Sequence, residues 1–290
     1  MRPTRISALP VAALLLLFTL AGPTATATAG AGTPSAARWA PRASATITPG
    51  VQMFTAGAQC TGNFVFTDDA GHVYVGYAAH CAGKGGQTDT DGCTTASHPI
   101  GTAVRFATGA TLATSGTTVG HGRLAYSSWR AMRRVGTTRA NACAYNDLAL
   151  VRVDADDRRR VNPTVPFWGG PEGVSSGGAP ATSQVYSWGQ SSIRPTSALS
   201  PKAGVSLGGT GGGWSWNVYT ASPGIPGDSG SGFLDADGRA LGVLSTVAIA
   251  PLAGSNGVGD LARELAFARA HSGIAGLRLV RGTAPFAPPA

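Results

Sequence analysis

The sequence predicts an all-β protein that ends in one α-helix. It contains 42 glycines among 290 residues, and only 12% of its side chains are charged, so strong helix formers are few. Short apolar segments separated by turn-forming residues recur between positions 47 and 272, as in sandwiches and barrels. The exception is the stretch 260–271, where Leu261, Leu265 and Phe267 recur at mostly helical spacing.

Residues 1–29 have the pattern of a secretory signal peptide. Two arginines precede a short apolar stretch, 11–20, and small-residue cleavage sites follow within 25–29. The apolar stretch is too short to span a bilayer comfortably, so we expect a secreted, extracellular protein rather than a membrane-anchored one. No cysteine precedes Cys60, which excludes a lipid-modified cysteine directly after the signal.

Both ends of the mature chain are poor in core-forming residues. Residues 30–46 are rich in Ala, Thr, Pro and Ser, and are expected to be a linker, a short propeptide or a disordered mature N-terminus. The tail, 273–290, ends in the Pro/Ala-rich stretch 282–290, which we expect to be disordered.

Two segments of the first half form a predicted β-hairpin. Residues 63–67 and 72–77 are apolar and aromatic, and they flank the turn sequence Asp-Asp-Ala-Gly at 68–71. The second segment leads directly into His80. The hairpin therefore determines where this histidine is presented.

Further strands are predicted on both sides of a Pro/Gly-rich connection, 162–180. Residues 148–153 form an apolar run directly after Asp147. In the second half, 184–189 and 241–247 have strand-like composition. One strand face, at a spacing of two, consists of Trp214, Trp216, Val218 and Thr220.

Three short motifs carry residues that suit nucleophilic catalysis. Ser229 lies in PGDSGSGF, 226–233, where glycines let backbone N–H groups turn toward one point. His80 ends the motif Ala-Ala-His-Cys, and Asp147 opens Asp-Leu-Ala-Leu. A serine hydroxyl needs a base and a supporting acid to become nucleophilic, and this chain offers them in the order His, Asp, Ser.

Together these motifs resemble the chymotrypsin/trypsin-like serine endopeptidases, in particular secreted bacterial ones. The resemblance implies an all-β fold of two six-stranded antiparallel β-barrels with a C-terminal α-helix. The first barrel would span 47–165 with His80 and Asp147, and the second 166–272 with Ser229 and the helix. The catalytic groups would meet in the cleft between the barrels.

The resemblance also implies a role for each residue. Ser229 would attack the peptide carbonyl, His80 would carry its proton, and Asp147 would orient the histidine. The N–H groups of Gly227 and Ser229 would form the oxyanion hole, and Ser245 matches the family serine that supports the aspartate.

Asp228 corresponds to the family aspartate that pairs with a freed N-terminal amine or with an internal cation. Ile47 distantly resembles a family N-terminus, but the preceding Ala45 and Thr46 are not a tryptic site. We therefore expect Asp228 to use an arginine or backbone donors, and the enzyme to be active without tryptic cleavage.

Four cysteines in an exported chain predict two disulfides. Of three possible connectivities, the resemblance favours Cys60–Cys81, which would brace the histidine loop. By elimination, the second bridge is Cys93–Cys143, which would tie the segment before Asp147 into the first barrel.

Substrate preference is expected from the positions that match the family's primary pocket. Pro223, six residues before the serine, would be the floor, and no Asp or Glu lies between 173 and 227 to pair with lysine or arginine. Thr246 and Val247 resemble the substrate-pairing strand, where Val247 narrows the entrance and Gly257, opposite, offsets this in part. We expect cleavage after small or medium apolar residues such as Ala, Val or Leu.

Other function classes are disfavoured. The formal charge of +8 comes largely from arginine clusters at 130–139 and 158–160, which lack the interleaved aromatics of a nucleic-acid platform. Asp89-Thr90-Asp91-Gly92 lacks the remaining ligands of a calcium loop, and the glycines at 208–213 are not followed by the Lys-Ser/Thr of a phosphate loop. No cofactor, metal, nucleic acid or membrane partner is expected.

The leading hypothesis is a secreted, monomeric serine endopeptidase that acts on proteins or peptides through an acyl-enzyme. Two alternatives stay open. One is a catalytically inactive binding protein or adhesin on the same fold, because a fold does not guarantee activity. The other is an esterase.

Overall fold

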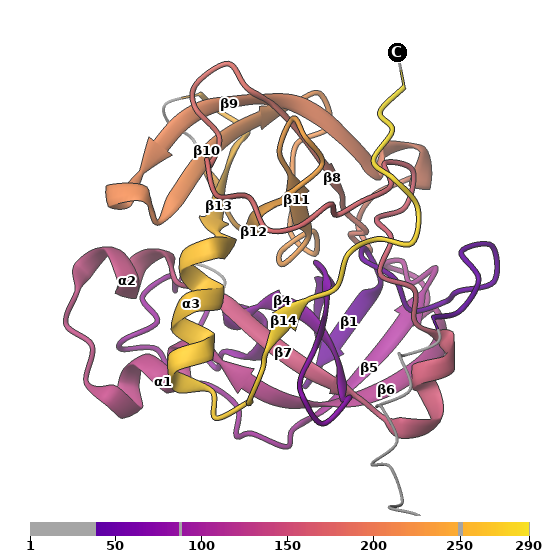
Figure 1. Cartoon of the computed structure of the whole chain (residues 1–290), viewed down its shortest axis with the longest axis horizontal. Helices are drawn as coiled ribbons and strands as arrows, with labels where there is room; N and C mark the ends of the chain where they lie inside the picture. Colours follow the sequence, from indigo (N-terminus) through magenta and orange to yellow (C-terminus); the bar gives the residue numbers. More distant parts are fainter. Residues whose placement is uncertain (1–38, 87–88, 249–251, 290) are drawn as a thin grey trace, which may run out of the picture. The chain divides into compact units, whose positions relative to one another are not determined.

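Seven strands from the first half of the chain and one short C-terminal strand form an eight-stranded antiparallel sheet (Figure 1). The structure, a computed structural model, describes residues 39–86, 89–248 and 252–289, so the predicted signal peptide and most of the 30–46 segment lie outside the described residues. In spatial order the strands are β14 (Arg278–Leu279), β3 (Val65–Thr67), β4 (Val73–Ala78), β7 (Leu148–Val153), β6 (Thr117–Ser127), β5 (Ala103–Thr108), β1 (Gln52–Thr55) and β2 (Ala58–Thr61).

This sheet curls because the bent segment 62–64 is hydrogen-bonded to chain near both ends of the sheet. Only residues 62–64 separate β2 from β3. The Gly62 N–H donates to the Val51 carbonyl (2.9 Å), which extends the β1–β2 ladder, and the Asn63 N–H donates to the Gly76 carbonyl (2.7 Å), which opens the β3–β4 ladder. The predicted hairpin is confirmed, but the first sheet turns back on itself through the chain and is not closed by strand pairing as a six-stranded barrel would be.

The second half forms a closed six-stranded barrel, as predicted. Its strands are β8 (Gln184–Trp188), β9 (Pro201–Thr210), β10 (Ser215–Thr220), β11 (Gly232–Leu234), β12 (Ala240–Ala248) and β13 (Ser255–Asp260). They close in the order β10–β13–β12–β11–β8–β9. With the helix that follows, this confirms the predicted chymotrypsin-like fold class.

The predicted C-terminal helix is α3 (Leu261–His271). The Asp260 side chain caps its first turn by accepting the Arg263 N–H at 2.9 Å. Its buried face packs against β7, β12 and α1 (Ser128–Val135), so the last helix contacts both sheets. The sequence analysis did not predict α1 or α2 (Ala140–Tyr145).

The tail beyond α3 is ordered by pairing, contrary to the disorder expected for 282–290. β14 adds to the edge strand β3 of the first sheet. Further on, the Gly282 N–H donates to the Pro171 carbonyl (3.0 Å) and the Ala287 N–H donates to the Trp168 carbonyl (2.8 Å). The sequence did not predict these contacts, because the residues that the tail binds lie more than 100 positions earlier in the chain.

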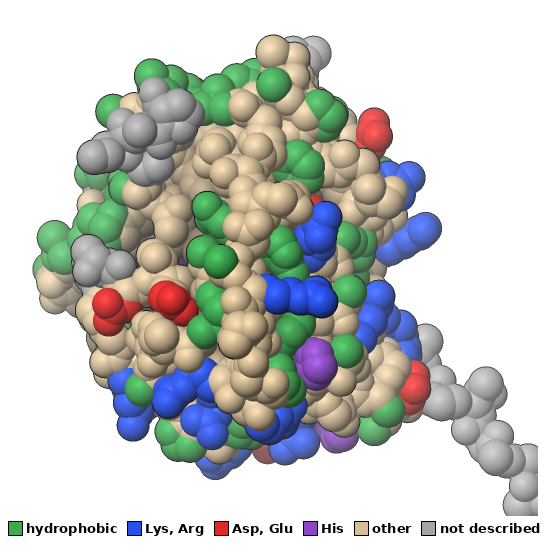
Figure 2. All heavy atoms as spheres, turned by 90° about the vertical axis from the view of Figure 1, so that its left-hand side faces the viewer, with side chains coloured by type: hydrophobic (Ala, Val, Ile, Leu, Met, Phe, Trp, Pro, Cys, Tyr) green, Lys and Arg blue, Asp and Glu red, His purple; other side chains and the backbone are tan. Residues whose placement is uncertain are grey.

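Two further predictions concern covalent bonds and charged surface. Both predicted disulfides, Cys60–Cys81 and Cys93–Cys143, are present. Arg130, Arg133 and Arg134 are exposed on α1, and Lys and Arg side chains gather along the lower part of the face drawn in Figure 2. Among the described residues, no helix is both long and apolar enough to traverse a bilayer.

Candidate active site

His80 is presented at the end of a fully buried strand. β4 carries only buried residues, and the chain leaves it in a short 3-10 turn, Ala79–Ala82. The next residue, Cys81, is bonded to Cys60 on β2, which anchors this turn to the sheet. The His80 side chain is 24% exposed, so the ring is held by the core but reaches solvent.

Asp147 meets His80 because β4 and β7 are paired. Their register places Ala78 opposite Leu148, so the residues beyond these two positions face each other. The Asp147 Oδ2 atom lies 2.7 Å from His80 Nδ1, and Oδ1 accepts the His80 backbone N–H at 2.8 Å. A further bond runs from the Ala79 N–H to the Asp147 carbonyl at 2.8 Å. The carboxylate therefore holds the imidazole and its backbone together.

The electrostatic environment raises the pKa of His80. Burial alone would lower the pKa, because it penalises the charged imidazolium. The charge of Asp147 and its hydrogen bond to the ring act in the opposite direction and together outweigh burial. The protonated form of His80 is consequently favoured relative to a histidine in water.

Ser245 completes the surroundings of the Asp147 carboxylate. It lies at a bulge in β12, where the register against β13 shifts between Leu244 and Thr246. Its hydroxyl donates to Asp147 Oδ2 at 2.6 Å. Bulges turn a side chain away from the regular alternation of a strand, and here the bulge directs a serine of the second barrel toward the first sheet.

The Ser229 backbone is held between the first sheet and the second barrel. Its carbonyl accepts the Thr61 N–H (2.8 Å), and the N–H of Gly230 donates to the Leu244 carbonyl (2.7 Å). A Cβ on Gly230 would lie 2.7 Å from the Ala78 backbone nitrogen, and its φ is +88°, so only glycine fits this close approach. Both Ser229 and His80 are described, and no hydrogen bond joins the serine hydroxyl to the imidazole; in unliganded sites such bonds are often long.

Two backbone N–H groups at the Ser229 turn have no hydrogen-bond acceptor among the described residues. Within the described part of the chain, the N–H groups of Gly227 and Ser229 make no hydrogen bond, whereas that of Asp228 donates to the Ile225 carbonyl at 2.9 Å. The Gly227 carbonyl accepts a hydrogen bond from the Thr61 hydroxyl (2.7 Å), and the φ angle of Gly227 is +92°. Free donors next to a nucleophile are what an oxyanion site requires.

Asp228 is completely buried and has the arginine partner that was expected. Its Oδ2 atom contacts the guanidinium of Arg194, and Oδ1 accepts the Ser191 N–H at 2.9 Å. A second cation, Lys202, lies 3.0 Å from Oδ2 and is itself fully buried. Burial lowers the pKa of Lys202, and the attraction of Asp228 does not fully offset this. The sequence analysis missed Lys202, because one lysine in a polar strand carries no pattern.

The predicted pocket residues on β12 and β13 have a register that differs from the expectation. Thr246 is opposite Gly257, and Val247 is opposite Asn256, so Gly257 does not face Val247 as expected. The buried Asn256 side chain accepts the Gly224 N–H (2.8 Å) and donates to the Thr246 carbonyl (3.3 Å). It thereby bridges the segment that carries Pro223 and the strand that carries Val247. The sequence analysis also missed this residue, since only the strand register brings it there.

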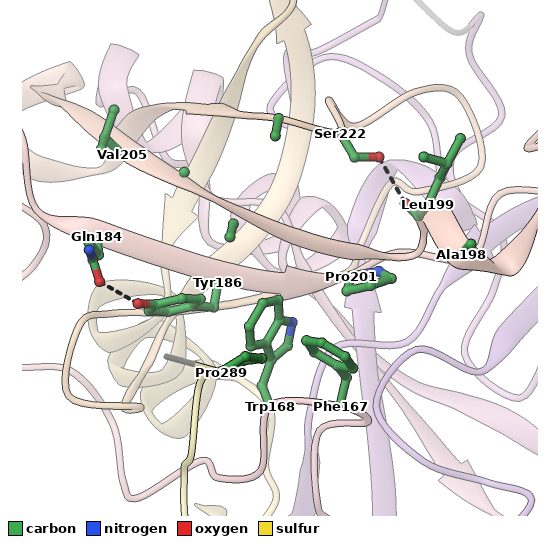
Figure 3. Close-up of a pocket in the computed structure, with 13 residues that line it drawn as sticks. Phe167, Trp168, Gln184, Tyr186, Ala198, Leu199, Pro201, Val205, Ser222 and Pro289 are labelled. Carbon is green, nitrogen blue, oxygen red and sulfur yellow. Dashed lines mark hydrogen bonds between the residues drawn. The ribbon is translucent and has the colours of Figure 1, made fainter.

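A pocket of about 760 Å³ lies elsewhere, on the outer face of β8 and β9. Its walls include Trp168, Tyr186 and Val205, and Figure 3 shows Phe167 and Pro289 beside Trp168. The hydrogen bonds drawn there, from Tyr186 to Gln184 and from Ser222 to Leu199, satisfy these groups internally. The pocket includes none of the predicted catalytic residues, so it is not the candidate site.

No protein-family model matches the sequence, and no curated protein sequence matches it. Similar solved structures are bacterial chymotrypsin-like serine proteases. Thermobifida fusca protease A is 17% identical, with a TM-score of 0.49, over 81% of this chain and 99% of that one. A Nocardiopsis protease is 20% identical (TM-score 0.44; 80% and 98% covered). Cellulomonas bogoriensis chymotrypsin is 18% identical (TM-score 0.44; 81% and 98% covered). Such distant likenesses carry no argument about activity, so the function rests on the site geometry.

Proposed function

We propose that the protein is a secreted serine endopeptidase with Ser229 as nucleophile, His80 as general base and Asp147 as the orienting acid. The observation that carries this proposal is the double contact of Asp147 with His80, at Nδ1 (2.7 Å) and at the backbone N–H (2.8 Å). This contact commits Nδ1 to the aspartate and leaves Nε2 available for a serine proton.

In the proposed reaction, Ser229 Oγ attacks the peptide carbonyl carbon while its proton passes to His80 Nε2. The carbonyl oxygen becomes an oxyanion, bound by the free N–H groups of Gly227 and Ser229. His80 then protonates the leaving amine, and the carbon–nitrogen bond breaks to give the acyl-enzyme. Water, deprotonated by His80, hydrolyses the ester and restores Ser229. Each oxyanion donor contributes about 3–4 kcal/mol of transition-state stabilisation in comparable sites.

Substrates are proposed to be proteins or peptides with a small or medium apolar residue before the scissile bond. Pro223, Thr246, Val247 and Gly257 belong to the proposed binding site. Arg194 Nη2 and Lys202 Nζ both lie 3.3 Å from the Pro223 carbonyl, so a cationic substrate side chain would meet two cations at the floor. The Asn256 side chain bonds to both Gly224 and Thr246, and a bridge between these two proposed walls would favour Ala over bulky residues.

Activity is proposed not to require a cut before Ile47. Asp228 already has Arg194, Lys202 and backbone N–H partners, so it needs no N-terminal amine. Ile47 itself is buried, and its N–H donates to the Arg160 carbonyl (3.1 Å). A gain of activity only after cleavage before Ile47 would contradict this part of the proposal.

Labelling by a fluorophosphonate, followed by peptide hydrolysis assays, tests the function. Ser229→Ala and His80→Ala should abolish both labelling and hydrolysis while the protein remains folded. Ser231→Ala is the matched control: its hydroxyl is buried, has no hydrogen-bond partner in the described part of the chain, and lies two residues from Ser229.

The assay also separates the alternative functions. A folded protein that is never labelled would be an inactive binding protein or adhesin. Labelling with hydrolysis of esters but not of peptides would identify an esterase. Turnover near the unsubstituted level in purified Ser229→Ala would disprove the assignment of the nucleophile.

Secretion, an extracellular location and a monomeric state belong to the same proposal. The two disulfides fit an oxidising compartment. The intact mass of the protein recovered from culture medium would show where the signal peptide ends and whether residues 30–46 are kept.

A further inference from the structure

A buried acid on the C-terminal helix contacts the backbone of Asp147. Glu264 lies on α3 and is 0% exposed. Its Oε1 atom accepts the Asp147 N–H at 2.8 Å. Sequence separation between the two residues is 117, so the contact depends entirely on how α3 packs against the sheet.

This contact satisfies the one polar group of Asp147 that no other residue binds. The carbonyl accepts the Ala79 N–H, and the two carboxylate oxygens bind His80 and Ser245. The β4–β7 pairing begins at Leu148, one residue later, so the ladder offers the Asp147 N–H no acceptor. A buried N–H without an acceptor is costly, and Glu264 removes that cost.

The local backbone leaves space for the Glu264 carboxyl group. A Cβ on Gly259 would lie 2.5 Å from Oε1 and 3.1 Å from the Tyr145 carbonyl. Glu264 shares the buried face of α3 with Leu261, Leu265 and Ala268, where an acid is otherwise unfavourable. A polar residue among apolar neighbours, beside a glycine that accommodates it, indicates a specific role.

We propose that Glu264 is a positioning residue that holds the backbone of Asp147, and through it the His80 imidazole, in the geometry for proton transfer. This inference rests on the proposed endopeptidase function. Glu264 touches neither substrate nor the reacting atoms, and it acts only through Asp147.

The surroundings of Glu264 favour its neutral form. Burial raises its pKa well above the usual value; the Asp147 N–H lowers it, but the charges of Asp147 and Asp260 raise it further. The groups that face it from neighbouring elements are Asp147 before β7, Asp260 before α3, Tyr126 on β6 and, beyond Tyr126, Arg134 on α1. A neutral acceptor fixes Asp147 without placing a second negative charge beside the His80 pair.

The first test follows the His80 titration by ¹⁵N NMR in the full-length mature protein with Ser229→Ala, which needs no catalysis. Glu264→Gln keeps a neutral acceptor and should retain the raised midpoint. Glu264→Leu leaves the Asp147 N–H unpaired, so the midpoint should fall toward the usual histidine value of about 6.5. Should the leucine variant fail to fold, Glu264→Met removes the acceptor in a side chain of similar length. Leu265→Ala is the control, because it weakens α3 packing without touching Asp147.

The second test is kinetic, in the otherwise unsubstituted protein. Glu264→Leu should lower kcat by about tenfold to a hundredfold with little change in KM, because an unpaired buried donor disturbs the transition state and not substrate binding. Glu264→Gln should recover most of the lost kcat, and Leu265→Ala should lower Tm while kcat persists.

Opposite results would overturn the inference in a defined way. An unshifted His80 midpoint in Glu264→Leu, or equal loss of kcat in the glutamine and leucine variants, would show that Glu264 does not position Asp147. Absence of peptide hydrolysis in the unsubstituted protein would instead refute the proposed function, and the NMR titration would still decide the contact.

Discussion

The two halves of the chain build their interiors from different chemistry. The first sheet encloses large apolar side chains, among them Phe64, Phe66, Phe106 and Trp129. Among the described residues of the second half, the separate apolar cluster has seven buried members, the largest being Phe233. The second half also buries many polar and charged side chains, namely Ser187, Lys202, Ser206, Ser215, Thr220, Asp228, Ser231, Ser255 and Asn256.

This difference divides the candidate site. His80 and Asp147 extend from the buried strands β4 and β7, so dispersion and apolar burial position them. The Ser229 loop is held by hydrogen bonds and by the ionic contacts of Asp228. Burying a polar group is unfavourable unless the group has a partner. Substitutions in the two halves should therefore destabilise the protein for different reasons.

The largest expected effect is on catalysis, from Asp147→Asn. An amide cannot accept from both the His80 ring and its backbone while also accepting from Ser245, so the imidazole would be held in the wrong tautomer. We expect kcat for a chromogenic peptide to fall by about 10⁴-fold.

Asp68→Asn is a matched control for this change. Asp68 Oδ2 lies 2.8 Å from His72 Nδ1, an equivalent pair on the β3–β4 turn that is distinct from the candidate site. Its kcat should stay near that of the unsubstituted protein. If both substitutions reduced kcat alike, the assignment of Asp147 would be wrong.

Stability measurements compare the two interiors directly. Phe106→Ala should lower the free energy of unfolding by about 3–5 kcal/mol, because it opens a cavity in a dense apolar core. Asp228→Ala should also lower the free energy of unfolding by about 3–5 kcal/mol, but for another reason. It leaves Arg194 and Lys202 buried without their anion.

Lys202→Met sharpens this comparison. One cation, Arg194, would remain for one carboxylate, so we expect urea denaturation to give an unfolding free energy within about 1 kcal/mol of the unsubstituted value. A loss as large as that of Asp228→Ala would mean that Lys202, and not Arg194, is the essential partner.

A smaller effect is expected on specificity. Asn256→Gly removes the bridge between Gly224 and Thr246 and opens space near the proposed pocket floor. The ratio of kcat/KM for Phe over Ala before the scissile bond should rise by about tenfold or more. Asn217→Ala, on the neighbouring strand β10 and without a side-chain hydrogen bond among the described residues, should leave the ratio unchanged.

The smallest effect is a displacement of the pH profile. His80 must be unprotonated to act as a base, and its pKa is raised by Asp147. The kcat/KM value should therefore be low in acid and rise with pH through a midpoint above about 6.5. The stabilising contribution of the His80–Asp147 pair has the opposite dependence: it is complete below the unfolded-state pKa and is lost as pH rises through the raised one. A kinetic midpoint below 6.5 would contradict the raised pKa.

Local sequence determined much of this protein. Alternating or continuous apolar runs predicted β4, β7, β8 and β12, and helical spacing predicted α3, because backbone geometry repeats over a few residues. The motifs around His80, Asp147 and Ser229 were recognisable for the same reason: strands flank His80 and Asp147, and glycines flank Ser229, within a few residues of the chain. Four cysteines predicted two disulfides, but the choice among three connectivities came from the family resemblance.

Tertiary structure alone decided which distant residues serve these motifs. Lys202 beside Asp228, Asn256 opposite Val247 and Glu264 beneath Asp147 each act from another strand or helix. The bonds from Gly282 to Pro171 and from Ala287 to Trp168 are also nonlocal, so the disorder expected for the end of the tail was wrong. Register and helix packing minimise the energy of the whole fold, and no window of neighbouring residues contains that information.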